Sequence, residues 1–247
     1  MKNYLNLIRK TANSGFTLVE LILASCLMVV VVGAAGYGIL VMTRENVSAN
    51  AAGDIQYNLG RAVDFISEEV KTASSIRDNV SPTNLTANAA NFAQAADKTV
   101  VLAIRVPGTS QDIIYYTKAP TGSEVWLGPL VIYRWGPSLD STGSYSNPST
   151  PANWTDSPLI DLIATTPKTT TCTTNSWIKI PSTTNGFFVC IDNTTGTSNN
   201  RKFVEIHASA SALNSNSLKW VNSSSTNSRF YDKATYEIIT QALARAN

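Results

Sequence analysis

The chain opens with a long apolar stretch that contains a single charged position. Between Phe16 and Met42 the only side chain charged at neutral pH is Glu20. The uncharged run Leu21–Met42 would be about 33 Å long as an α-helix, which is enough to cross the hydrocarbon core of a bilayer. Because basic residues precede this run, the N-terminus should stay in the cytoplasm and the rest of the chain should lie outside. The pattern predicts a membrane-spanning helix over 16–42.

An apolar stripe with helical spacing continues beyond this span. Apolar residues recur near multiples of 3.6 positions at Val47, Ile55, Leu59, Val63, Ile66 and Val70. Such spacing predicts an amphipathic helix whose apolar side packs against another element. We therefore expect one helix over 16–75, with 43–75 as its amphipathic part. Glu68 and Glu69 are adjacent and do not face each other on a helix, so they are interpreted as a solvated face rather than an acid/base pair.

The remainder, 76–247, is rich in Ser, Thr and Asn and predicts an extracytoplasmic, β-rich globular domain. Polar loops are expected over 74–98 and 136–154. Short apolar runs between turn signals predict strands at 99–106, 113–118, 125–135, 159–164, 177–180, 187–191 and 203–208. The composition of the tail 234–246 suits a helix, and a strand is the alternative. The predicted fold class is α+β, with the long N-terminal helix packed on a mainly antiparallel β-sheet.

The net charge of +2 resides at the N-terminus. Three of the 19 basic residues, Lys2, Arg9 and Lys10, lie in the first fifteen positions, which contain no acid. Without them the chain has 16 basic and 17 acidic residues. A nearly neutral chain lacks the electrostatic footprint of a nucleic-acid-binding protein, so no nucleic-acid partner is inferred.

Three ordinary signals compete to explain the N-terminal stretch. A secretory signal peptide has an apolar stretch of about 7–15 residues, and this run is longer and contains a carboxylate. Leu23-Ala24-Ser25-Cys26 fits a lipoprotein signal, but cleavage there would leave the apolar run 27–42 behind a lipidated cysteine. A plain single-pass anchor accounts for the length of the run but not for Glu20.

Glu20 distinguishes among these explanations. An unpaired carboxylate near the start of a membrane helix is costly, and such residues are usually functional. If the chain were cut between Gly15 and Phe16, a new α-amino cation would appear about one helical turn before Glu20. The carboxylate could neutralise that amine on its own chain or on a neighbour, in a medium where the pair is much stronger than in water.

The run Gly15-Phe16-Thr17-Leu18-Val19-Glu20, followed by the apolar helix, resembles the class III signal of type IV pilins and type II secretion pseudopilins. The resemblance implies that prepilin peptidase removes the leader 1–15 by cutting after Gly15 and that Phe16 is then N-methylated. It also implies a type IV pilin-like fold, in which Glu20 acts in assembly. The implied partners are other pilin or pseudopilin subunits, an inner-membrane assembly platform, and the membrane before assembly.

Finer resemblances lie further along the chain. The segment 55–70 looks like that of minor pilins or J-type pseudopilins, and Val131–Pro137 with Leu159–Asp161 resembles pseudopilins linked to polysaccharide secretion in cyanobacteria. The family resemblance favours a strand for the tail. One departure is that glycines at 33, 36 and 38 stand where many major pilins have a proline.

Two of the three cysteines lie in the predicted exported part. Cys172 and Cys190 flank a predicted hairpin, and export makes them a candidate disulfide. Two free thiols in a reducing compartment are the alternative. Cys26 lies within the apolar run, where a small, weakly polar side chain is tolerated.

The sequence contains no recognisable catalytic or cofactor motif. His207 is the only histidine and is interpreted as a structural strand residue. There is no G-x-S-x-G elbow and no C-x-x-C pair, so neither a catalytic residue nor a metal site or cofactor is expected. The segments 140–143 and 192–194 could offer oxygens to calcium, although Asx turns explain them as well.

The expected function is therefore structural rather than enzymatic: a minor pilin or pseudopilin, first in the cytoplasmic membrane and then in a pilus or pseudopilus at the cell surface. The alternative is a membrane-anchored extracytoplasmic binding module, for example for polysaccharide, that keeps residues 1–15.

Overall fold

The computed structural model describes residues 16–183, 185–194, 196–198, 200–211 and 235–245. The chain divides into two compact units, 1–47 and 48–247. The predicted leader 1–15, with Gly15, lies outside the described residues, as do the first and last positions of the predicted tail element.

One helix, α1 (Leu18–Thr72), contributes residues to both units. Its first part is long and apolar enough to cross a membrane, judged by length and composition. The helix was expected to reach residue 75 but ends at Thr72. The chain leaves it there because the backbone N–H of Ser74 bonds the Arg105 carbonyl at 2.7 Å, which starts a strand.

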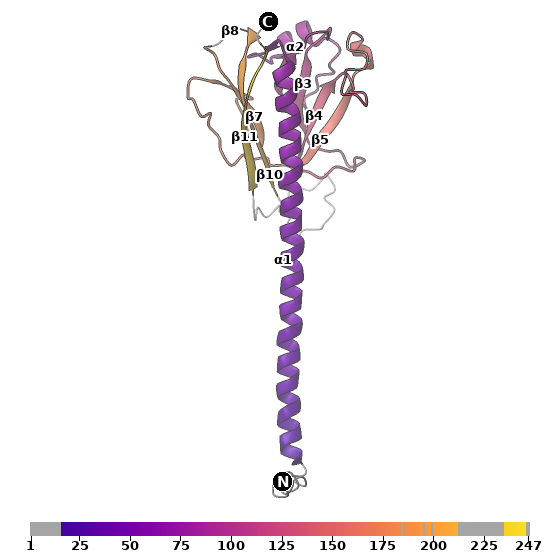
Figure 1. Ribbon diagram of the computed structural model, residues 1–247, viewed down its shortest axis with the longest axis vertical. Helices are drawn as coiled ribbons and strands as arrows, with labels where there is room; N and C mark the ends of the chain where they lie inside the picture. The colour runs from indigo at the N-terminus through magenta and orange to yellow at the C-terminus, as the bar shows by residue number, and fades with distance from the viewer. Residues whose placement is uncertain (1–15, 184, 195, 199, 212–234, 246–247) are drawn as a thin grey trace, which may run out of the picture. The chain divides into compact units, whose positions relative to one another are not determined.

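The second unit contains an eleven-stranded antiparallel sheet (Figure 1). Its strands are β1 (Ser75–Ile76), β2 (Thr99–Arg105), β3 (Ile113–Lys118), β4 (Leu130–Gly136), β5 (Thr155–Ile163), β6 (Ile178–Ile180), β7 (Phe187–Ile191), β8 (Gly196–Thr197), β9 (Asn200–Arg201), β10 (Phe203–Ser211) and β11 (Thr235–Leu243). The order is β6-β7-β10-β5-β4-β3-β2-β1-β9-β8, and β11 pairs with β10 along its whole length. The α+β fold class is confirmed, and the tail is a strand.

The core lies between the second part of α1 and the inner face of this sheet. Five residues of the predicted stripe are buried on α1: Ile55, Leu59, Val63, Ile66 and Val70. They form one cluster with inward residues of β2, β7 and β10, such as Ile104, Val189 and Ile206. Fully burying each such side chain is worth about 1.5–3 kcal/mol. Val47, which we also assigned to the stripe, is 53% exposed.

A second, aromatic cluster covers the outer face of β2, β3 and β4. It contains Leu85, Phe92, Tyr116, Tyr133, Trp135 and Trp154. The short helix α2 (Pro82–Asn88) and the segment after it supply the covering side chains, and Trp154 follows the single turn of 3₁₀-helix η2 (Pro151–Asn153). The prediction of a polar loop over 74–98 is therefore wrong in part, because this segment contains β1 and α2.

The predicted strand at 125–135 also needs correction. The strand β4 begins only at Leu130. Gly128 and Pro129 precede it, and a proline has no N–H to donate to the ladder. Val125, Trp126 and Leu127 instead form an exposed apolar stretch, 88%, 38% and 41% exposed. The strands predicted at 159–164 and 203–208 are confirmed but longer, since β5 starts at Thr155 and β10 runs to Ser211.

Candidate functional site

The start of α1 is closed by reciprocal hydrogen bonds between Thr17 and Glu20. Both the backbone N–H and the hydroxyl of Thr17 donate to Oε2 of Glu20, at 3.0 Å each. In return the Glu20 N–H donates to the Thr17 hydroxyl at 3.3 Å. This is a capping box, the arrangement by which a Thr before a helix and a Glu three residues later satisfy each other's backbone N–H groups. From the sequence we assigned Glu20 to assembly and missed this local role, although the T-x-x-E spacing indicates it.

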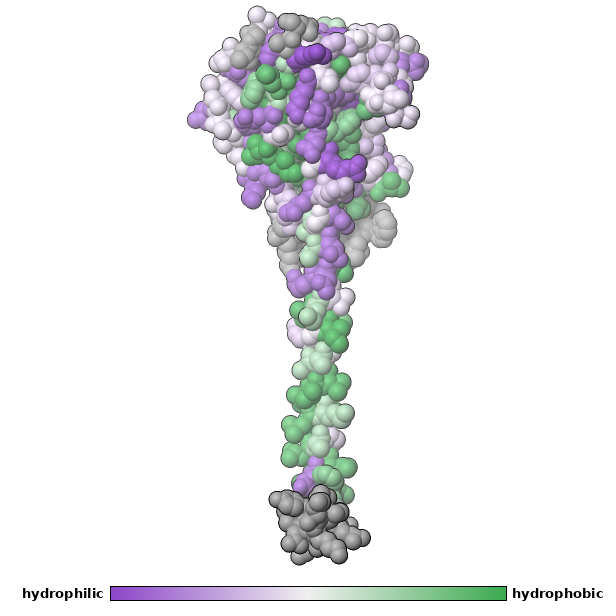
Figure 2. Space-filling view, viewed as in Figure 1, coloured by the Kyte–Doolittle hydropathy of each residue, from purple (hydrophilic) through white to green (hydrophobic). Residues whose placement is uncertain are grey.

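The apolar part of α1 exposes its side chains along its length. Phe16 is 87% exposed, and residues further along are similar, such as Leu21 at 65%, Val30 at 68% and Met42 at 70%. Figure 2 shows this segment as mainly hydrophobic. Exposed surface of this kind marks contact with a membrane or with other protein.

The glycines of this segment leave open space on the helix surface. A Cβ added at Gly33, Gly36 or Gly38 would meet nothing within 4 Å. Small residues on an apolar helix let another backbone approach closely, which is how many membrane helices associate. Cys26 is a free, exposed cysteine in the same segment.

A buried ion pair joins α1 to the sheet, and its acid is Glu69. Arg134 of β4 donates to Glu69 through Nε, at 2.9 Å to Oε2, and through Nη2, at 2.6 Å to Oε1. The hydroxyls of Tyr115 and Tyr145 also donate to the carboxylate. Our interpretation of a solvated face is therefore wrong for Glu69, whereas the Glu68 side chain is 72% exposed.

The charges in this cluster shift the pKa of its members. Burial and the Glu69 charge together raise the pKa of the Tyr115 phenol well above its usual range, and the same two causes raise the pKa of Tyr145. Burial lowers the pKa of the Arg134 guanidinium, but the hydrogen bonds and charge of Glu69 outweigh it and the net shift is upward. The Arg134 guanidinium therefore stays charged at any ordinary pH.

The predicted disulfide between Cys172 and Cys190 is present. It fastens residues 165–177, which we call the covering segment, to the outer face of the sheet at β7. Two carboxylates hold the same segment. The Thr173 N–H donates to Glu205 of β10 at 3.0 Å, and the Thr169 N–H donates to Glu237 of β11 at 3.0 Å.

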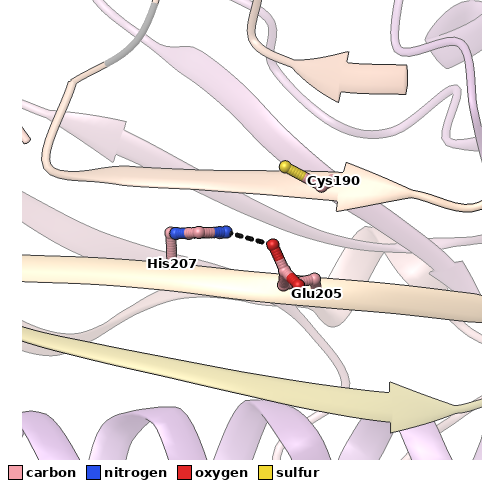
Figure 3. A group of neighbouring side chains, drawn as sticks. All are labelled: Cys190, Glu205 and His207. Atoms are coloured by element: carbon pink, nitrogen blue, oxygen red, sulfur yellow. Dashed lines mark hydrogen bonds and ion pairs between the residues drawn. The ribbon is translucent and has the colours of Figure 1, made fainter. Parts of the chain in front are cut away.

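Glu205 and His207 of β10 lie close to Cys190 of β7 (Figure 3). Nε2 of His207 lies 2.6 Å from Oε1 of Glu205, and the imidazole stacks on Phe188 with ring centroids 4.2 Å apart. Burial raises the pKa of Glu205, but hydrogen bonds from Thr173, Gln241 and His207 outweigh it and hold the pKa at about 2. One ligand atom each from Cys190, Glu205 and His207 lies within 4.8 Å of the other two.

Two other sequence candidates are Asx turns. Asp140 accepts the N–H groups of Thr142 and Ser144, at 2.8 and 3.0 Å, and Asp192 accepts the N–H of Thr194 at 2.8 Å. Local backbone donors therefore bind Oδ1 of both aspartates, as in an Asx turn.

A shallow cavity of about 230 Å³ lies between α1 and β5. Apolar side chains and two acids line it, among them Ile55, Leu127, Asp54 and Asp161. Asp161 already accepts the N–H of Leu127 at 2.9 Å.

No protein-family model matches the chain, and no curated protein or solved structure matches it either. The long N-terminal apolar helix followed by an antiparallel sheet is compatible with a pilin-like fold.

Proposed function

We propose that this chain is a structural subunit, of the minor pilin or pseudopilin kind, in a type IV pilus or type II secretion-like filament. One observation carries the proposal: an apolar helical segment with exposed side chains begins at Leu18, two residues after Phe16, and Glu20 in its first turn is the single acid of its apolar run. A soluble protein would bury such a surface. In a filament subunit this apolar surface contacts lipid before assembly and packs against neighbouring helices afterwards.

The geometry at Thr17 and Glu20 supports a separate role for each carboxylate oxygen of Glu20. Both hydrogen bonds from Thr17 go to Oε2, which leaves Oε1 for a cation. Cleavage after Gly15 by prepilin peptidase would create that cation as the α-amine of Phe16, and N-methylation keeps it charged. Glu20 of one subunit would then pair with the Phe16 amine of the next and set the register between helices.

Substitutions at the capping box separate the two roles of Glu20. Glu20→Gln keeps an acceptor for the Thr17 N–H but removes the charge. Thr17→Ala keeps the charge and removes the hydroxyl. We expect both precursors to be cleaved, Glu20→Gln to drop out of sheared filaments, and Thr17→Ala to be incorporated. Glu45→Gln, on the same helix outside the apolar run, is the control and should assemble normally. Normal incorporation of Glu20→Gln contradicts the proposed pairing.

The alternative function, a membrane-anchored extracytoplasmic binding module, has a different processing state. It would retain residues 1–15 and act as single copies in the membrane. In that case neither substitution at the capping box would change its surface location, and the chain would be absent from sheared filaments.

A further inference from the structure

The outer face of β7 and β10 brings together four side chains of the kinds that bind zinc. Cys190 and Glu205 are direct cross-strand partners. His207 lies two positions after Glu205 and therefore projects from the same face. Cys172 reaches this point from the covering segment through its disulfide. Cys190, Glu205 and His207 are 0%, 0% and 1% exposed, whereas Cys172 is half-buried.

We propose that the chain binds one Zn²⁺ through Cys172, Cys190, Glu205 and His207 when this disulfide is reduced. Thiolate, imidazole and carboxylate are all ligands that zinc accepts, and four ligands complete its tetrahedral coordination. Zinc–ligand bonds of about 2.0–2.3 Å place neighbouring ligand atoms roughly 3.3–3.8 Å apart. The atoms from three of these residues already lie within 4.8 Å of one another, and the two sulfurs have to separate once their bond is broken.

The redox step determines whether the site exists. The thiolate is the form of cysteine that binds metals, so the disulfide form offers only Glu205 and His207. A dithiol reductant supplies two electrons and two protons, the S–S bond breaks to give two thiols, and the reductant is oxidised to its own disulfide. Zinc then displaces one proton from each thiol, so two protons are released for each ion bound.

The charge of the cluster is compatible with an ion at this point, whereas the tautomer of His207 has to change. The two thiolates balance the divalent ion, so replacing the two thiol protons by zinc leaves the net charge of the cluster unchanged. Binding through Nε2 of His207 requires the ring proton to sit on Nδ1. In the disulfide form the hydrogen bond from His207 to Glu205 places this proton on Nε2. Zinc therefore has to replace that hydrogen bond, and the proton has to move to Nδ1, which has no hydrogen-bond partner among the described residues. We did not expect zinc from the sequence, because the four ligands come from separate segments and form no C-x-x-C pair.

Zinc would hold the covering segment on the sheet while the thiols are still reduced. In the disulfide form the same attachment is made by the Cys172–Cys190 bond together with the Thr173 N–H to Glu205. A chain that has just been exported and is not yet oxidised would therefore have the same segment fastened at the same place.

Cobalt titration of the full-length chain in detergent tests this site. The Cys26→Ser variant removes the third thiol and serves as the parent. After anaerobic reduction and removal of the reductant, we expect one equivalent of Co²⁺ to give thiolate-to-cobalt charge-transfer bands with the intense visible bands of tetrahedral cobalt. Zn²⁺ should displace it. The oxidised parent should show neither set of bands.

Matched variants identify the ligands. His207→Asn and Glu205→Gln should each weaken cobalt binding by about tenfold or more. Glu237→Gln is the control, because Glu237 holds the same segment through Thr169 but is not in the cluster. Near-ultraviolet circular dichroism of the oxidised variants checks their fold.

A measurement on the parent alone keeps the test decisive even if a variant does not fold. Zinc should raise the melting temperature of the reduced parent and leave that of the oxidised parent unchanged. The proposal is overturned if the reduced parent gives no thiolate–cobalt bands, if zinc stabilises both redox forms equally, or if folded His207→Asn and Glu205→Gln bind cobalt as tightly as the parent.

Discussion

Glu69 on α1 and Arg134 on β4 form a two-pronged ion pair in which each side chain is only 4% exposed. Arg134 also donates to the Pro137 carbonyl at 2.9 Å, which ties the loop after β4 to the same point. The pair thus connects the helix, the sheet and a loop beneath the protein surface.

Breaking this pair should be strongly destabilising. Glu69→Ala leaves a buried guanidinium without its partner, which typically costs about 3–5 kcal/mol. The measurement is the free energy of unfolding of the full chain in detergent by chemical denaturation. Glu68→Ala is the matched control, since its exposed pair with Lys71 is worth less than about 1 kcal/mol. Similar losses for the two variants would show that the buried pair does not fasten α1 to the sheet.

The disulfide should contribute measurably to stability. Cys172 and Cys190 are 18 residues apart, and closing a loop of that length is worth about 3 kcal/mol in the chain-entropy model. Replacing both by Ser should lower the free energy of unfolding by about that amount in metal-free buffer. Cys26→Ser should leave it unchanged, because Cys26 is free and exposed. An unchanged midpoint in the double variant would contradict the prediction.

Alkaline conditions should destabilise the globular unit. Burial, with the nearby charge of Glu124, raises the pKa of Tyr133 to about 12, and the pKa values of Tyr115 and Tyr145 are also raised. A tyrosine whose pKa is higher in the folded state than in the unfolded state stabilises the folded protein at pH values below the unfolded-state pKa. This stabilisation is lost as the pH rises through the folded-state pKa. We therefore expect stability to fall from about pH 10 upward. Phenolate absorbance should show part of the nine tyrosines ionising only on unfolding. Ionisation of all nine in the folded state near pH 10 would be inconsistent with these shifts.

Much of the fold followed from local patterns, whereas the buried polar contacts did not. The stripe Ile55–Val70 predicted the buried side of α1, and the short apolar runs of β2, β3 and β7 predicted strands that are almost wholly buried. The ion pair was missed because helix spacing was applied only to apolar residues. Glu69 follows Ile66 by three positions and precedes Ala73 by four, and both are buried, so its side chain faces the core. Identifying Arg134 as its partner requires the register of a strand 65 residues away.

The cluster around Glu205 was missed for a related reason. His207 was correctly placed within a strand, but nothing in the local sequence indicates that Cys190 lies directly opposite Glu205. Cross-strand pairing is set by tertiary contacts, and motif searches see only residues that are close in the sequence.

Prepilin processing should depend on Gly15. Gly15→Ala should leave the uncleaved precursor in the membrane, visible as a band that does not shift on electrophoresis. Gly33→Ala is the control, because an added Cβ meets nothing within 4 Å there, and its precursor should be processed normally. Cleavage of Gly15→Ala at the parental rate would argue against a prepilin-type signal.

The mass of the N-terminal peptide of the native protein is the most direct test of the central claim. If the chain is a filament subunit of this kind, the peptide begins at Phe16 and carries one added methyl group on its amine. A peptide that begins at Met1, or one that begins at a lipidated Cys26, would contradict the proposed function.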